Sequence, residues 1–485
     1  MAIDAPARSV THHLRSSFAW SAAESVTNIL AAVATTVLVG RIIGPAAFGL
    51  AALAWLFGSL AEVLVTTPLV DPLIQRRQLD VPVVDTAFTT MMATGTLLYL
   101  LILATAPFLA WLYDKPELTG LLAVQGTTCL LTAVRGVPEA LLARELRFKA
   151  LALRGIVAKI AGALVAIGAA GLHAGAWSII LGNVAFAAAS AATIVSIAPR
   201  WPRFAWQPQH ARSLWSFGVF SVLDAFLWTA TTRLFSVLVG YFHGTRVLGN
   251  LNFALRINDT LCAFMLAVTT RLALPIFSRV AEDPQRLEEV FLRGTRVAFL
   301  FTAPAFLGLA FLSPEIIAIA LGPEWPLAAP SLVAACLFSL LNFALVLGHS
   351  TVKAAGKPSW LMFPNLVGLV YILVGSLAVG HLRFEAQLAV WTSWGLVFVV
   401  CSLRMMRKAI GTTWLKQLQA LAPAVLPSLS MCAVLYGITL AQPGTAALAA
   451  ALKLVLGGLT YLLVVAALER SLAMQIVRRT AQTGG

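Results

Sequence analysis

Apolar stretches long enough to cross a lipid bilayer recur along the whole chain, and they constrain its fold more than any other feature. About 20 consecutive apolar residues span the hydrocarbon core as one helix. Only 11% of the 485 residues are charged, whereas a soluble domain carries about 25%. The sequence therefore predicts an all-α polytopic membrane protein with about 14 transmembrane helices, not a soluble domain.

The predicted spans are joined by short connectors that are rich in glycine, proline and small polar residues, as tight turns require. Their limits are residues 17–40, 46–68, 84–108, 118–142, 150–171, 174–198, 213–240, 246–274, 294–312, 328–352, 359–380, 384–404, 417–440 and 446–468.

Basic residues alternate between the loops in a way that predicts orientation. The net charge is +14, which in a soluble protein would suggest nucleic acid. In a membrane protein, lysine and arginine gather in the cytoplasmic loops. With a cytoplasmic N-terminus, 24 of the 34 basic residues fall in cytoplasmic segments and only four in external ones. Both termini are predicted to be cytoplasmic, and no nucleic-acid partner is expected.

An internal repeat indicates two halves of the same orientation. Residues 37–54 read VLVGRIIGPAAFGLAALA and residues 237–254 read VLVGYFHGTRVLGNLNFA, with three glycines in register. The second copy begins six spans after the first, so both cross the membrane in the same direction. The predicted parts are a cytoplasmic segment 1–16, an N-lobe 17–200, a cytoplasmic linker 201–212, a C-lobe 213–404, two further spans within 417–468, and a cytoplasmic tail 469–485.

Motifs for catalysis or cofactor binding are missing from the sequence. The five cysteines are scattered through apolar segments without CxxC or Cys/His spacing, which supports neither a metal site nor a disulfide framework. No GxxxxGK[ST] nucleotide-binding motif occurs. We therefore expect no catalytic residues, no metal and no cofactor.

Charged residues inside the predicted spans are the candidate functional groups. Each charge at bilayer depth costs about 2.5–3.5 kcal/mol, so such groups line a wet cavity or pair with one another. The candidate substrate-binding cations are Arg135, Lys159, Arg233, Arg256 and Arg271. The candidate coupling or charge-balancing acids are Glu24, Glu62, Glu139, Asp224 and Asp259.

Spacing predicts which of these charges pair. Arg135 and Glu139 are four residues apart on one helix face, with Pro138 between them. Arg256 and Asp259 are three apart and equally able to meet. Two interpretations stay open: ion pairs that hold helices together, or cations that receive an anionic ligand, since arginine suits bidentate contact with phosphate.

Three charges, Arg271 among them, lie near predicted helix ends. Long side chains at such positions extend to the membrane surface. This snorkelling is the interpretation of Asp85, Arg271 and Lys453.

Several motifs, in order along residues 15–410, resemble one known family. They are GRIIGPAAFGLAAL (40–53), PLIQRRQLD (72–80), VPEALLARELRFKAL (137–151), GAWSIILGN (175–183), PIFSRVAEDPQRL (275–287) and LGPEW (321–325). The chain resembles the polysaccharide transporters, or Wzx-type oligosaccharide flippases, of the multidrug/oligosaccharidyl-lipid/polysaccharide (MOP) superfamily. Phe235 and Ser236 depart from the pattern, because the family often has an Asp–Asn pair there.

The resemblance implies a fold and a function. The fold is two lobes around a central cavity that opens alternately to each side. The substrate is undecaprenyl-pyrophosphate-linked oligosaccharide, moved across the bacterial inner membrane for exopolysaccharide or lipopolysaccharide (O-antigen) biosynthesis. Expected partners are this substrate and the inner-membrane lipids. The glycan polymerase and chain-length regulator of the same pathway are further candidates.

Two alternatives share the hydropathy of this chain. A cation-coupled drug exporter of the same superfamily would favour an acidic or aromatic pocket for organic cations, and the embedded bases argue against it. A membrane glycan polymerase or ligase usually carries a large external loop with essential arginine and histidine. The external histidines here, His173, His243 and His381, sit in predicted tight turns.

Overall fold

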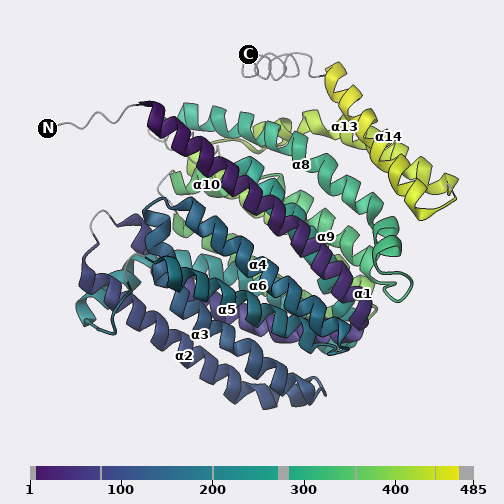
Figure 1. The fold of residues 1–485 in the computed structure, drawn as a ribbon. Coiled ribbons are helices and arrows are strands. Elements are labelled where there is room, and N and C mark those ends of the chain that lie inside the picture. Colours follow the sequence, from purple (N-terminus) through teal and green to yellow (C-terminus); the bar gives the residue numbers. More distant parts are fainter. Residues whose placement is uncertain are drawn as a thin grey trace. The chain divides into compact units, whose positions relative to one another are not determined.

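Every regular element in the described part of the chain is a helix (Figure 1). The computed structural model describes residues 7–76, 79–198, 201–270, 283–354, 358–442 and 444–468. The helices are α1 (Ala7–Gln75), α2 (Val81–Leu112), α3 (Glu117–Arg144), α4 (Phe148–Gly171), α5 (Trp177–Ile197), α6 (Pro208–Thr270), α8 (Pro284–Ala320), α9 (Ala328–Phe343), α10 (Leu347–Ala354), α11 (Met362–Val379), α12 (Phe384–Ile410), α13 (Trp414–Ala441) and α14 (Ala446–Leu468), with a 3-10 turn η1 (Pro358–Leu361) before α11.

The chain is a multi-pass membrane protein. In the described ranges, 12 helices are long and apolar enough to cross a membrane. Two of these segments, Ala31–Ile74 and Val222–Ala267, are 44 and 46 residues long, about twice the length that one crossing needs. Each overlaps two of the spans predicted from the sequence. The all-α membrane fold is confirmed, whereas the count of 14 spans is not.

The internal repeat is visible in the backbone. Helix α1 loses helical geometry at Gly44 (φ 74°, ψ 171°), and α6 loses it at Gly244 (φ 80°, ψ 176°). These two glycines are equivalent in the predicted repeat. Glycine adopts positive φ without steric penalty, so both copies of the sequence encode the same interruption at the same place.

The two repeats cross each other at a second pair of equivalent glycines. A Cβ atom on Gly49 would overlap the carbonyl oxygen of Thr245 and lie 2.8 Å from the amide nitrogen of Gly249. A Cβ on Gly249 would overlap the carbonyl oxygen of Pro45 and lie 3.0 Å from the amide nitrogen of Gly49. The contact is therefore reciprocal, and it brings two backbones closer than any side chain permits.

Two compact units divide the chain, and the boundary falls inside α6. Unit 1 is Met1–Phe253 and unit 2 is Ala254–Gly485. The glycine crossing assigns the start of the second repeat to unit 1, since residues 245–249 pack on residues 45–49. These units are defined by packing and the predicted lobes by symmetry, so the lobe limits stay a prediction.

Small residues set the distance between α4 and α5 in unit 1. A Cβ on Gly162 would lie 2.9 Å from the carbonyl oxygen of Gly182, and a Cβ on Gly182 would lie 2.7 Å from the side chain of Ala166. Gly162 and Ala166 are four residues apart on one face of α4. This small-xxx-small pattern allows helices to pack closely inside a bilayer, where the hydrophobic effect does not drive helices together.

Asp85 on α2 does not extend to the membrane surface as predicted. Its side chain is buried, and Oδ1 accepts a hydrogen bond of 3.0 Å from the backbone N–H of Arg203. One turn along α2, the Thr89 hydroxyl lies 3.0 Å from both the amide and the carbonyl of Ala205. Phe88 contacts the rings of Trp201 and Phe204. Asp85 thus holds the segment before α6 against α2.

Lys453 on α14 also differs from its predicted role. Its side chain is 1% exposed, and Nζ lies 2.6 Å from Oε1 of Glu315 on α8. Nζ also donates to the carbonyl oxygen of Phe311 at 2.9 Å. Farther along α14, the Tyr461 hydroxyl donates to the carbonyl oxygen of Leu300 at 2.7 Å. Lys453 is therefore one of the polar contacts that attach the C-terminal hairpin to α8.

Candidate functional site

The pair predicted from spacing on α3 is present. Arg135 Nη1 lies 2.9 Å from Oε2 of Glu139, one helical turn away. The side chains are 18% and 28% exposed, so neither is fully surrounded by protein. The prediction that these two charges meet is confirmed.

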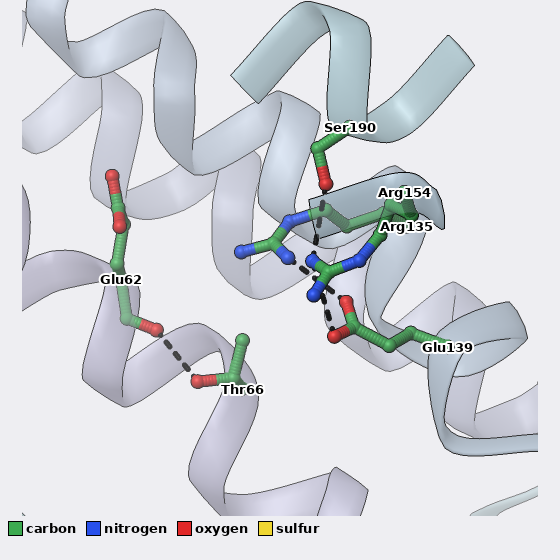
Figure 2. A network of polar contacts seen from close by, with 6 residues as sticks. All are labelled: Glu62, Thr66, Arg135, Glu139, Arg154 and Ser190. Atoms are coloured by element: carbon green, nitrogen blue, oxygen red, sulfur yellow. Dashed lines mark hydrogen bonds and ion pairs between the residues drawn. The ribbon is translucent and has the colours of Figure 1, made fainter. Parts of the chain in front are cut away.

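A second arginine joins this pair from a neighbouring helix. Arg154 on α4 places Nη1 3.2 Å from the other oxygen of Glu139, Oε1. The same nitrogen donates to the Ser190 hydroxyl on α5 at 3.2 Å. Figure 2 shows both guanidinium groups turned toward the single carboxylate. We call Arg135, Glu139, Arg154 and Ser190 the arginine cluster.

Glu62 on α1 begins a series of hydrogen-bonded polar side chains in the same unit. Its Oε1 accepts a hydrogen bond of 2.5 Å from the Thr128 hydroxyl on α3. Gln125 Nε2 donates to Thr128 Oγ1 at 3.4 Å, and Asn183 Nδ2 on α5 donates to Gln125 Oε1 at 3.1 Å. The Arg135 guanidinium lies within electrostatic range of the Glu62 carboxylate. These hydrogen-bonded residues and the arginine cluster therefore form one polar region across α1, α3, α4 and α5.

Arg233 on α6 stacks on an aromatic ring within unit 1. Its guanidinium carbon lies 4.2 Å from the ring centroid of Trp55 on α1. A cation over a tryptophan face is attracted by the ring quadrupole, by about 0.5–2 kcal/mol depending on exposure. This contact holds the guanidinium of α6 against α1.

The remaining predicted residues are spread over both units. Lys159 and Asp224 are half-buried in unit 1, Arg256 is half-buried in unit 2, and Asp259 in unit 2 is exposed. The side chains of Glu24 and Arg271 lie outside the described residues. The structure thus brings Glu62, Arg135 and Glu139 into one region, and the other predicted residues are not shown to join it.

Sequence reasoning missed three members of this region. Arg154 is one of the 24 basic residues that the charge pattern assigns to cytoplasmic segments, because it lies close to the predicted start of its span at residue 150. The structure begins α4 at Phe148, so Arg154 lies almost two turns inside the helix. Gln125 and Asn183 were not predicted at all, although a buried polar residue in an apolar span is a signal that it has partners.

Within the described ranges, no group of three or more His, Cys, Asp or Glu side chains is arranged to hold a metal ion.

A solved structure shares the fold of this chain. The solved structure titled "Lipid II flippase MurJ, inward closed conformation" superposes with a TM-score of 0.73, covering 94% of this chain and 100% of that chain, at 15% sequence identity. At this identity the likeness shows the fold alone. The chain therefore has the fold of that flippase structure.

The family follows from the sequence comparison. Residues 38–330, more than half of the chain, match the family described as "Polysaccharide biosynthesis protein", and the chain belongs to this family. The amylovoran biosynthesis protein AmsL of Erwinia amylovora is 27% identical over 57% of this chain and 72% of its own length. The succinoglycan biosynthesis transport protein ExoT of Rhizobium meliloti is 24% identical over 61% of this chain and 60% of its own length.

Proposed function

We propose that this protein is a flippase that moves lipid-linked oligosaccharide across the bacterial inner membrane for exopolysaccharide or lipopolysaccharide biosynthesis. The match of residues 38–330 to a polysaccharide biosynthesis family carries the proposal. A relative named as a transport protein of succinoglycan biosynthesis and the flippase-like fold support it. The protein acts by transport, not catalysis, and both of its termini are cytoplasmic.

The physical task of such a flippase is to carry a hydrated sugar headgroup through hydrocarbon. Polar groups that leave water need compensating hydrogen bonds, and charged groups need counter-charges. The embedded cations Arg135, Lys159, Arg233, Arg256 and Arg271 offset the diphosphate that links sugar and lipid. The lipid tail stays in the bilayer, so only the headgroup needs this polar environment.

Glu62 is the acid best placed to couple the transport cycle to an ion. It lies in a membrane-spanning helix and is half-buried, and its hydrogen-bond chain reaches α3 and α5. A change in its protonation or a bound cation would alter the bond to Thr128. Such a change would loosen or tighten the packing of three helices at once.

Alanine at Arg233 or Arg256 is expected to reduce glycan export in a strain that lacks the chromosomal copy. Loss of one charge-assisted hydrogen bond to phosphate removes about 1.5–3 kcal/mol, which corresponds to about a tenfold or larger loss of affinity. Lysine at either position keeps the charge and should retain part of the export, although it loses the planar fork. Exported glycan is measured at matched protein levels.

Full export by both alanine variants, at wild-type protein abundance, would remove these two arginines from the substrate path. A matched control is Arg383→Ala, since Arg383 is exposed and its guanidinium meets only the exposed Glu385 among the ion pairs described. This control should export normally.

A further inference from the structure

The arginine cluster has the geometry of an anion site that a carboxylate already fills. Each oxygen of Glu139 faces one guanidinium, at 2.9 Å for Arg135 and 3.2 Å for Arg154. Three helices contribute to the cluster, and the Ser190 hydroxyl completes it (Figure 2). Two convergent guanidiniums around one bidentate anion is the arrangement that proteins use for phosphate as well as for carboxylate.

The donors of Arg135 are incompletely used. Nη1 donates to Glu139, but the buried Nε–H has no hydrogen-bond partner among the described residues. An orphaned buried donor is destabilising, and this guanidinium can donate a hydrogen bond to a further oxygen ligand. A carboxylate offers two oxygens, whereas a diphosphate offers several and carries more charge.

The position of Glu139 allows it to leave. Pro138 precedes it in the interior of α3, and proline has no N–H for the carbonyl one turn earlier. The missing hydrogen bond weakens the helix beside the carboxylate. Glu139 is also the most exposed ion-pair member of the cluster, at 28% against 18% and 15% for the two arginines.

We propose that Arg135 and Arg154 form a diphosphate site that Glu139 shields when no substrate is bound. The diphosphate of a lipid-linked substrate displaces the Glu139 carboxylate and binds both guanidiniums and the Ser190 hydroxyl. This inference rests on the proposed flippase function and assigns the part of the substrate that this cluster recognises.

The shield makes an unusual prediction about affinity. Removing the carboxylate in Glu139→Gln should strengthen diphosphate binding by about tenfold, because the internal competitor is gone. Removing either cation, in Arg135→Gln or Arg154→Gln, should weaken it by about tenfold or more. A cluster that only holds helices together would show no gain of affinity on removal of the acid.

The experiment measures binding of farnesyl diphosphate to the purified full-length protein in detergent by isothermal titration calorimetry. Farnesol tests for binding of the prenyl tail alone, and inorganic pyrophosphate is added as a competitor to test for recognition of the diphosphate. The matched control is Glu288→Gln, which makes the same charge change in another ion pair, in which Glu288 Oε1 lies 3.0 Å from Lys416 Nζ. The affinity of this control variant for farnesyl diphosphate should equal that of the wild type.

Tighter binding by Glu139→Gln, weaker binding by both arginine variants and competition by pyrophosphate would support the site. Equal affinity in all variants, weaker binding by Glu139→Gln, or equal binding of farnesol would overturn it. Glu139→Ala provides a second removal of the acid if Glu139→Gln unfolds, as judged by its melting temperature. If Arg135→Gln and Arg154→Gln keep both their affinity and normal glycan export, the diphosphate site is rejected. The proposed flippase function is not contradicted by that result.

Discussion

Replacing Gly249 by alanine is expected to destabilise the protein strongly and to stop export. The new Cβ would overlap the carbonyl oxygen of Pro45 and approach the backbone of Gly49. These neighbours are backbone atoms, which cannot rotate away as a flexible side chain can. Overpacking in a well-packed core costs about 1–3 kcal/mol and occasionally more, and we expect the upper end. Gly49→Ala should behave alike, because the contact is reciprocal.

The matched control for this prediction is Gly168→Ala in α4. An added Cβ there meets no atom of the described residues within 4 Å, and alanine favours a helix over glycine by about 1 kcal/mol. This variant should be as stable as the wild type or slightly more stable. The measurement is the thermal unfolding midpoint in detergent, together with glycan export. A Gly249→Ala protein as stable and active as Gly168→Ala would contradict the close crossing of the repeats.

Replacing Lys453 by methionine is also expected to destabilise the protein strongly. It leaves the Glu315 carboxylate without its counter-charge. Oε2 of this carboxylate already has no hydrogen-bond partner in the part of the chain that the structure describes. The substitution also removes the donor to the Phe311 carbonyl. Breaking a buried pair by removing one partner costs about 3–5 kcal/mol. A lower unfolding midpoint and faster proteolysis of the α13–α14 hairpin should result.

The double variant Lys453→Met with Glu315→Leu tests the cause. Replacing both members of a buried pair by apolar residues is often neutral or stabilising. The double variant should therefore recover most of the stability that the single variant loses. A double variant no more stable than Lys453→Met alone would show that the ion pair is not what Lys453 contributes.

The repeat and the membrane fold could be predicted from the sequence because both depend on local signals. Apolar windows report directly on helices that cross a bilayer. The glycines in register at Gly44 and Gly244 mark a backbone conformation that other residues adopt with difficulty. Even so, the contact between Gly49 and Gly249 could not be predicted, since matching sequences do not say whether two repeats touch.

The charged residues were predictable only where their partners were close in sequence. Arg135 and Glu139 are one helical turn apart, and helix geometry alone places them together. Arg154 and Lys453 find their partners on other helices, and sequence distance carries no information about such contacts. Both lay near predicted helix ends, where cytoplasmic anchoring or snorkelling was the simpler interpretation.

The most direct test of the proposed function is transfer of substrate between leaflets by the purified protein. A polyprenyl-diphosphate oligosaccharide with a fluorescent sugar is placed in proteoliposomes, and a membrane-impermeant quencher reports the fraction in the outer leaflet. We predict that the protein equilibrates the labelled lipid between leaflets far faster than protein-free liposomes do. Transfer no faster than in protein-free liposomes, with folded and correctly inserted protein, would contradict the flippase function.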